Sequence, residues 1–208
     1  AYIAAAQKSD LSIGVAMTDG KGDRSLRPSQ QTQPDTYVHV VARRPGGIFI
    51  KGVKAIITGA PYMHELLVMP CRRMLEEDKD FAVACAVPID ADGLTIVTRP
   101  AGRPGQESAK FSAKFAQSVA VAHFDNVFVP YEKVFIDGEV EAAHVMTTNY
   151  ATHHRHSCIG ARAGFGDLLI GAGAMMARAN GLDYEKTPHL REKMVDLIKI
   201  TEGFYACG

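Results

Sequence analysis

Residues 37–57 read YVHVVARRPGGIFIKGVKAII. The two arms of this stretch, Tyr37–Arg43 and Ile48–Ile57, are rich in β-branched and aromatic residues, which favour extended strands. Between them, Arg44-Pro45-Gly46-Gly47 has the composition of a tight turn. The stretch therefore predicts two antiparallel strands joined as a hairpin.

Strand patterns continue on both sides of this hairpin. Before it, residues 11–17 alternate apolar and small side chains with the two-residue period of a half-buried strand. After it, turn formers such as Asp90-Ala91-Asp92-Gly93 separate further β-rich runs at residues 65–69, 81–87, 94–98 and 118–129. These short strands together predict a compact antiparallel β-barrel or sandwich.

The pattern changes from strand to helix after Asp137-Gly138. Residues 139–150 and 151–180 contain no proline and many alanines, which predicts helices. Asn180-Gly181 is a helix stop and Thr187-Pro188 is a helix start, so another helix should begin near residue 189. The chain also opens on residues 2–9, which have the composition of a helix end without an N-terminal cap.

The predicted fold class is therefore α+β, in a fragment of a longer chain. Residues 1–10 are expected to end an N-terminal helical domain, and residues 11–137 to form the β domain. Residues 138–208 are expected to be the first helices of a C-terminal helical bundle, because the apolar residues from 190 onward fall on one helical stripe.

Composition excludes several classes of function. The hydrophobic share of 47% is enough for a sizeable core, and 23 basic residues balance 23 acidic ones, so no overall charge attracts nucleic acid. We find no apolar run long enough to cross a membrane and no signal peptide, which predicts a cytoplasmic protein. The four cysteines form no paired motif, which argues against a structural zinc site or a disulfide framework.

Two local patterns carry candidate chemistry. The loop Lys21-Gly22-Asp23-Arg24 follows a predicted strand, and its glycine and two cations suit close approach to a phosphate or a ring carbonyl, although a charged hairpin turn has the same composition. In residues 153–158, His154 and Cys158 share one helical face. Two ligands do not make a metal site, and an ordinary domain-junction helix fits equally well, so no metal site is predicted.

Several segments resemble one family of flavoenzymes, which contains the 4-hydroxyphenylacetate 3-monooxygenases and the 4-hydroxybutyryl-CoA dehydratases and has an acyl-CoA-dehydrogenase-like fold. The resemblance covers essentially the whole chain. It is carried by residues 18–25 (TDGKGDRS), 52–54 with Thr58-Gly59, 78–83 (DKDFAV), 90–94 (DADGL), 124–130 (FDNVFVP) and 154–157 (HRHS).

The resemblance implies FAD as cofactor and a set of site residues. It places the flavin against the loop and against the hydroxyl of Thr58, and it makes His154 and Arg162 the candidate catalytic residues. It also implies a homotetramer, a small organic substrate (an aromatic acid or an acyl-CoA) and a separate flavin reductase. The cofactor-binding residues implied are Met17, Thr18, Lys21, Gly22, Asp23, Arg24 and Thr58.

The two branches of the family differ at a few positions. In the dehydratases, a [4Fe-4S] cluster is held by cysteines and one histidine; His154 matches the histidine, whereas Ala161 replaces an expected cysteine, which makes the cluster unlikely. Cys158 takes the place of the dehydratase tyrosine, and Arg162 that of its lysine. In the monooxygenases, a histidine near the substrate phenol corresponds to Val15.

These comparisons leave three functions open. The first is a two-component monooxygenase that uses reduced FAD and O2 to hydroxylate an aromatic, 4-hydroxyphenylacetate-like substrate. The second is a 4-hydroxybutyryl-CoA dehydratase or vinylacetyl-CoA Δ-isomerase-like lyase. The third is a catalytically altered paralogue that has lost the cofactor, suggested by the number of replaced site residues.

Overall fold

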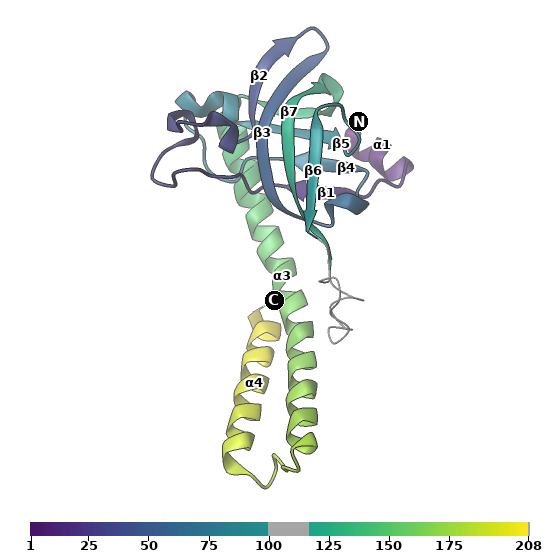
Figure 1. Ribbon diagram of the computed structural model, residues 1–208, viewed down its shortest axis with the longest axis vertical. Coiled ribbons are helices and arrows are strands. Elements are labelled where there is room, and N and C mark those ends of the chain that lie inside the picture. The colour runs from purple at the N-terminus through teal and green to yellow at the C-terminus, as the bar shows by residue number, and fades with distance from the viewer. Residues whose placement is uncertain (100–116, 208) are drawn as a thin grey trace. The chain divides into compact units, whose positions relative to one another are not determined.

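The computed structural model describes residues 1–99 and 117–207, which divide into two compact units, residues 1–147 and 148–208. The first unit holds all the described strands, most of which Figure 1 labels. Each unit is described by itself below. The part of the predicted β domain at residues 100–116 lies outside the described residues.

The first unit contains two four-stranded sheets. One sheet has the order β1 (Ile13–Ala16), β4 (Glu65–Val68), β5 (Val83–Pro88) and β8 (Val134–Asp137), with β1 and β4 parallel and the other pairs antiparallel. The other sheet is wholly antiparallel and has the order β2 (His39–Arg44), β3 (Gly47–Thr58), β7 (Val119–Pro130) and β6 (Leu94–Arg99).

The two sheets share one hydrophobic core. Leu66 and Val87 enter it from the first sheet, and Ile48, Ile50 and Phe124 enter it from the second, all with exposed fractions of 0%. Core residues alternate with outward-facing ones along β3 and β7, as expected for sheets with one buried face. The unit is thus an antiparallel sandwich with one parallel strand pair, which confirms the α+β class.

Short helices connect the strands of this unit. α1 (Tyr2–Lys8) precedes β1, and its Tyr2 hydroxyl donates to Glu65 of β4 at 2.6 Å. Short 3-10 helices fill the connections at Pro28–Gln30, Pro34–Thr36, Ala60–Tyr62, Glu76–Phe81 and Tyr131–Lys133.

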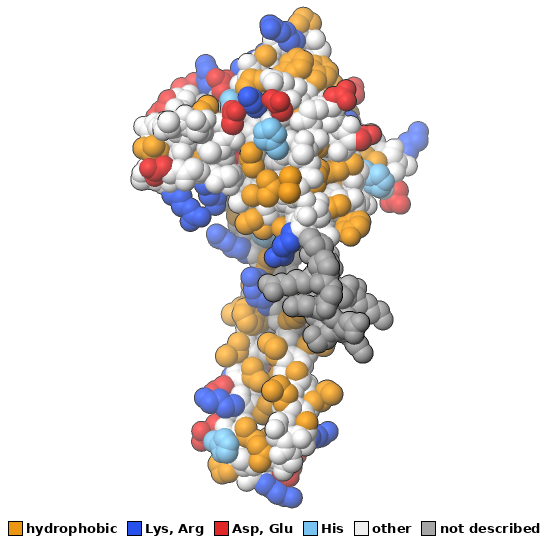
Figure 2. All heavy atoms as spheres, in the orientation of Figure 1, with side chains coloured by type: hydrophobic (Ala, Val, Ile, Leu, Met, Phe, Trp, Pro, Cys, Tyr) orange, Lys and Arg blue, Asp and Glu red, His pale blue; other side chains and the backbone are white. Residues whose placement is uncertain are grey.

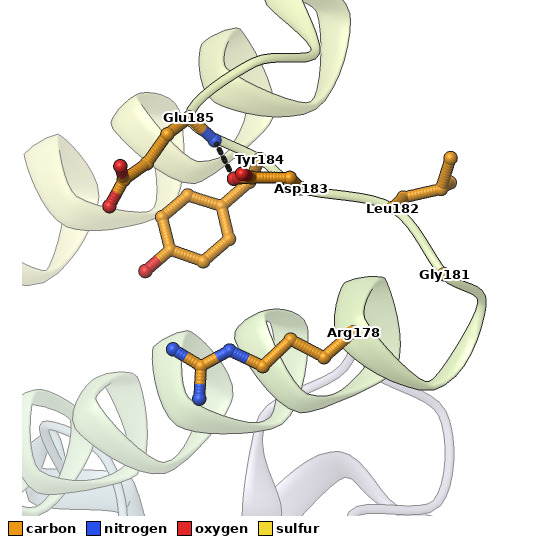
Figure 3. A pocket seen from close by; sticks show the side chains of 6 residues that line it. All are labelled: Arg178, Gly181, Leu182, Asp183, Tyr184 and Glu185. Atoms are coloured by element: carbon orange, nitrogen blue, oxygen red, sulfur yellow. Dashed lines mark hydrogen bonds between the residues drawn. The ribbon is translucent and has the colours of Figure 1, made fainter.

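The second unit is a helical hairpin that consists of residues 148–179 of one long helix and of the helix that follows it. α3 (Val140–Ala179) is one continuous helix where two segments were predicted, and α4 (Pro188–Cys207) begins at the predicted proline. The helices approach closely at Gly166, where an added Cβ would lie 2.4 Å from Thr201 Oγ1. Gly181, with φ of 68°, follows the end of α3 as predicted, and Arg178 with residues 181–185 lines an open pocket of about 390 Å³ (Figure 3).

The strand predictions agree with the structure except at three points. β5 begins at Val83, because Phe81 closes the preceding 3-10 helix, and β8 was missed, because four residues are too few to show a period. The β3–β7 pairing is interrupted by a bulge at which the exposed Ile56 has a φ of 59°. No helix in residues 1–99 and 117–207 is long and apolar enough to cross a membrane.

Hydrophobic side chains also lie on the surface of both units (Figure 2). On the first unit, Ile56, Val97 and Val121 project from the outer face of the β3–β7–β6 sheet. On the second, Phe165, Leu169 and Met175 are more than half exposed along α3. Apolar surface of this kind is typical of faces that pack against other protein segments.

Candidate functional site

The loop that follows β1 is held at both ends by backbone hydrogen bonds. The Ala55 amide of β3 donates to the Thr18 carbonyl at 2.7 Å, and the Lys21 amide donates to the Thr36 carbonyl at 3.2 Å. The side chains of Met17 and Thr18 are half-buried. The residues predicted to begin the cofactor site therefore have fixed positions.

A buried ion pair lies beneath this loop. Lys54 Nζ on β3 is 2.6 Å from Asp19 Oδ1, and both side chains are 2% exposed. The same ammonium donates to the carbonyls of Met17 at 3.0 Å and Met69 at 2.8 Å, so its three protons have three acceptors. Asp19 Oδ1 also accepts the Val38 amide at 3.2 Å. Lys54 on β3 thus joins the start of the loop, at Met17 and Asp19, to the segment that contains Met69.

Sequence reasoning missed this ion pair, although a signal was present. β3 alternates buried and partly exposed residues, and Lys54 falls on the buried phase between apolar neighbours. A lysine at an inward position requires an acidic partner or carbonyl acceptors. Asp19, in the loop already singled out, is that partner.

The loop itself has a left-handed backbone at two successive residues. Lys21 has φ of 71° and Gly22 has φ of 46°. A Cβ on Gly22 would lie 2.4 Å from Gln31 Oε1. That oxygen accepts the Asp23 amide at 3.0 Å, while Gln31 Nε2 donates to the Asp23 carbonyl at 2.7 Å. Gly22 therefore leaves room for the glutamine that orders the loop.

Asp23 stabilises the turn with its own carboxylate. Its Oδ1 accepts the Ser25 hydroxyl at 2.7 Å and the Ser25 amide at 2.9 Å, and these hydrogen bonds lower the Asp23 pKa. The carboxylate therefore stays ionised and faces its own loop, which leaves the cations as the groups able to meet an anion.

Three cations line one cavity beside the loop. Lys21, Arg24 and Arg72 surround a space of about 270 Å³, together with Tyr37 and Cys71. Arg72 is oriented by a hydrogen bond from Nη1 to the Leu26 carbonyl at 3.3 Å. Burial, with the nearby charge of Asp19, raises the Cys71 pKa, so this thiol adds no negative charge. The lining therefore favours an anionic group such as a phosphate.

A second buried carboxylate fixes the segment that follows the loop. The fully buried Asp78 accepts hydrogen bonds from Arg27 Nε at 2.8 Å, from the Ser29 hydroxyl at 2.6 Å and from the Leu75 amide at 3.1 Å. Burial acts to raise the Asp78 pKa, but these hydrogen bonds lower it overall. The ion pair therefore connects both sides of the cationic cavity, because Arg72 and Arg24 lie on the segments it joins.

Thr58 lies apart from the residues that line the cavity. It is the last residue of β3, pairs with Val119, and is exposed. The next residue, Gly59, has φ of 75°, and its amide donates to the Ser118 carbonyl at 2.7 Å. The Thr58 hydroxyl is thus available at the end of the strand, but Thr58 is not among the residues that line the cavity of Lys21 and Arg24.

The second unit carries the other predicted residues on one face of α3. His154 Nε2 is 3.6 Å from Cys158 Sγ, and Arg162 Nη1 donates to the Cys158 carbonyl at 3.4 Å. The Tyr150 ring stacks on His154 with centroids 5.5 Å apart. The structure thus adds Tyr150 to the face on which the sequence already placed His154 and Cys158.

This helical cluster does not supply the donor set of an iron–sulfur cluster. Cys158 offers a soft thiolate sulfur and His154 an imidazole nitrogen, but the next matching position on the face is Ala161, which has no ligating side-chain atom. Residues 1–99 and 117–207 contain no group of three histidine, cysteine or acidic side chains placed to hold a metal ion. The described residues therefore do not fit a complete cluster site.

Known proteins are similar to this chain in both sequence and fold. A 4-hydroxybutyryl-CoA dehydratase/vinylacetyl-CoA-Delta-isomerase from Clostridium aminobutyricum is 38% identical over 100% of the chain and 43% of its own length. An archaeal 4-hydroxybutyryl-CoA dehydratase structure from N. maritimus has a TM-score of 0.87 at 36% identity, covering 99% of this chain and 41% of that one.

Structures from the other branch are also similar. The oxygenase component of 4-hydroxyphenylacetate 3-monooxygenase, complexed with FAD, has a TM-score of 0.84 at 27% identity, covering 99% of this chain and 43% of that one. A steroid acyl-CoA dehydrogenase shares the fold, with a TM-score of 0.64 at 18% identity. The chain thus spans about two-fifths of the length of these relatives from the two branches of the family.

Two family models also match the chain. The model described as 4-hydroxyphenylacetate 3-hydroxylase N terminal matches residues 1–136, and the model described as 4-hydroxyphenylacetate 3-hydroxylase C terminal matches residues 143–208. The chain therefore belongs to the 4-hydroxyphenylacetate 3-hydroxylase family, whose members include flavin monooxygenases and 4-hydroxybutyryl-CoA dehydratases.

Proposed function

We propose that this chain is the flavin-binding portion of an FAD-dependent enzyme that acts on a small organic substrate. The observation that carries the proposal is the cavity in which Lys21, Arg24 and Arg72 converge beside the glycine-containing loop. The residues fit FAD, because a diphosphate is anionic and three cations face one cavity beside the loop. A relative of the same family has been solved with FAD bound.

In this proposal the chain's own residues bind and orient the cofactor. The cations of the cavity neutralise phosphate charge, while Lys54 holds the Met17 carbonyl and the Ala55 amide holds the Thr18 carbonyl. Thr58 offers a hydroxyl that can donate or accept a hydrogen bond at the ring edge. His154 and Arg162 supply a proton-transfer group and a fixed positive charge to the substrate. Bound FAD supplies the redox chemistry.

The first candidate reaction is hydroxylation of an aromatic substrate with reduced FAD and O2. Ala161 favours it, since flavin oxygen chemistry does not need the cluster ligand that is missing at this position. A separate reductase would deliver the reduced flavin, and the active form would be a homotetramer in the cytoplasm.

The second candidate is dehydration or Δ-isomerisation of a CoA thioester. Sequence similarity favours it, because the dehydratase from Clostridium aminobutyricum is 38% identical, whereas the monooxygenase structure is 27% identical. In this case His154 would move the substrate proton. Remaining cluster ligands would then have to come from outside the described residues.

One experiment on the full-length protein separates these candidates. The protein is purified without oxygen, loaded with FAD, and analysed for iron and sulfide; it is then assayed with ¹⁸O2 and phenolic acids, and with vinylacetyl-CoA. Flavin without iron, together with ¹⁸O in the product, supports the monooxygenase. Stoichiometric iron and sulfide with vinylacetyl-CoA turnover supports the lyase, and protein that binds no FAD would refute both.

A further inference from the structure

Tyr37 adds an aromatic hydroxyl to the cavity that Lys21, Arg24 and Arg72 line. The residue is buried, with an exposed fraction of only 2%. Its ring packs edge to face against the ring of Phe81, with centroids 6.4 Å apart and an interplanar angle of 88°. The position of the Tyr37 ring is therefore fixed by packing and does not depend on its polar end.

The backbone on both sides of Tyr37 is bound to the loop that follows β1. Directly before it, the Thr36 carbonyl accepts the Lys21 amide at 3.2 Å. Directly after it, the Val38 amide donates to Asp19 Oδ1 at 3.2 Å. Because these two hydrogen bonds flank Tyr37, its side chain keeps a constant position relative to the loop and its cations.

The Tyr37 hydroxyl has no hydrogen-bond partner among residues 1–99 and 117–207, although the residue is buried. A hydroxyl that is buried without a partner carries a large desolvation cost. In this part of the chain, no fully buried side-chain oxygen or nitrogen lacks a partner. The hydroxyl is therefore the part of Tyr37 that opens to the cavity, where it can donate to a bound group.

The cavity thus combines three cations with one neutral, directed donor. The cations supply positive charge, and the phenolic O–H supplies a hydrogen bond of fixed direction. A carboxylate has two oxygens to accept these groups, whereas a diphosphate has enough oxygens for all of them.

We propose that Tyr37 is a phosphate-binding residue of this cavity, whose hydroxyl donates to a phosphate oxygen of the bound anion. The role rests on the proposed function, in which that anion is the diphosphate of FAD. The hydroxyl would then orient the diphosphate while the cations neutralise its charge.

The test is Tyr37→Phe in the full-length protein, with FAD binding followed by flavin fluorescence and stability followed by urea unfolding. Phenylalanine keeps the ring that packs against Phe81 and removes only the hydroxyl. We expect the variant to bind FAD about tenfold or more weakly than the wild type, as the loss of a hydrogen bond to a charged group produces. We expect it to unfold at the same urea concentration, because the hydroxyl has no partner within the described residues.

Two other tyrosines of the first unit serve as controls. Tyr131→Phe removes a hydroxyl from an exposed side chain outside the cavity and should change neither measurement. Tyr2→Phe removes a hydroxyl that donates to Glu65 at 2.6 Å and should lower the urea midpoint. If Tyr37→Phe lowers the midpoint as Tyr2→Phe does, the Tyr37 hydroxyl is structural and its role in binding is overturned.

Inorganic pyrophosphate separates the role of Tyr37 from the proposed function. Equal FAD affinity in wild-type and Tyr37→Phe protein would refute the role of Tyr37 and leave the flavin proposal standing. If the wild type binds no FAD, the proposed function fails, and calorimetric titration with pyrophosphate decides the role of the hydroxyl. Pyrophosphate binding that Tyr37→Phe weakens would support that role, whereas unchanged or absent binding would overturn it.

Discussion

Replacing Lys54 by methionine should destabilise the first unit strongly and release the start of the loop that follows β1. The Asp19 carboxylate, 2% exposed, would lose its partner at 2.6 Å, and the carbonyls of Met17 and Met69 would lose their donor. Breaking a buried ion pair by removing one partner costs about 3–5 kcal/mol, because the remaining charge stays buried. In a unit of this size, each kcal/mol lowers the melting temperature by about 2–4 °C.

The assay is urea unfolding followed by circular dichroism, with FAD affinity measured in parallel. Lys51→Met is the matched control on the same strand, since Lys51 pairs with Asp35 at 3.2 Å on the surface and should cost less than about 1 kcal/mol. Adding Asp19→Asn to Lys54→Met should recover part of the loss, because no buried charge is then left. If Lys54→Met costs no more than Lys51→Met, the account of the loop's anchor is refuted.

Three further predictions concern other positions. Asp78→Asn should flatten the acid end of the profile of stability against pH. The folded-state pKa of Asp78 is depressed, so its contribution to stability is present above the ordinary carboxyl pKa of about 3.9 and is lost as pH falls through the lower folded value. Acid titration followed by circular dichroism checks this, and an unchanged profile would contradict it. In urea unfolding, Gly52→Ala should lower the free energy of unfolding by at least about 2 kcal/mol more than Gly46→Ala does. Both glycines have positive φ, but only at Gly52 would a Cβ meet the backbone, 2.3 Å from the Tyr37 carbonyl oxygen. Equal losses would argue against the clash. Gly166→Ala should destabilise the helical hairpin, because the new Cβ would contact Thr201. Gly164→Ala, where the Cβ would enter open space, should stabilise the hairpin by up to about 1 kcal/mol in thermal melts. Stability changes of the same sign in the two variants would contradict the packing.

Periodic segments of the fold were predictable from sequence. The hairpin at residues 37–57 forms the β2–β3 pair, with Arg44 opposite Gly47 across the turn. The helix stop at Gly181 and the helix start at Pro188 are also where expected. These features depend on local turn and capping chemistry, which a single sequence records.

Features that depend on distant contacts were not predictable. β8 forms because Val134–Asp137 completes the edge of a sheet beside β5, and four residues carry no period by themselves. The pairing of Asp78 with Arg27 joins residues far apart in sequence. The unbroken α3 arises because the tract around residue 150 contains no helix breaker, although its composition changes there.

The candidate site was predicted in part. Motif resemblance selected Lys21 and Arg24, which do line the cationic cavity, whereas the third cation, Arg72, lies outside the matching motifs. The supporting residues Lys54, Gln31 and Tyr37 come from elements that only tertiary structure brings to the loop. Whether each predicted residue contacts FAD stays a prediction.

The most direct test of the central claim is a titration of the full-length protein with FAD, followed by flavin fluorescence. We predict saturable binding that weakens roughly tenfold to a hundredfold in Arg24→Gln, because a charge-assisted hydrogen bond contributes about 1.5–3 kcal/mol. Arg44→Gln, at the exposed hairpin turn, should bind as the wild type does. Absence of FAD binding by the wild-type protein, or equal affinity in Arg24→Gln, would contradict the account.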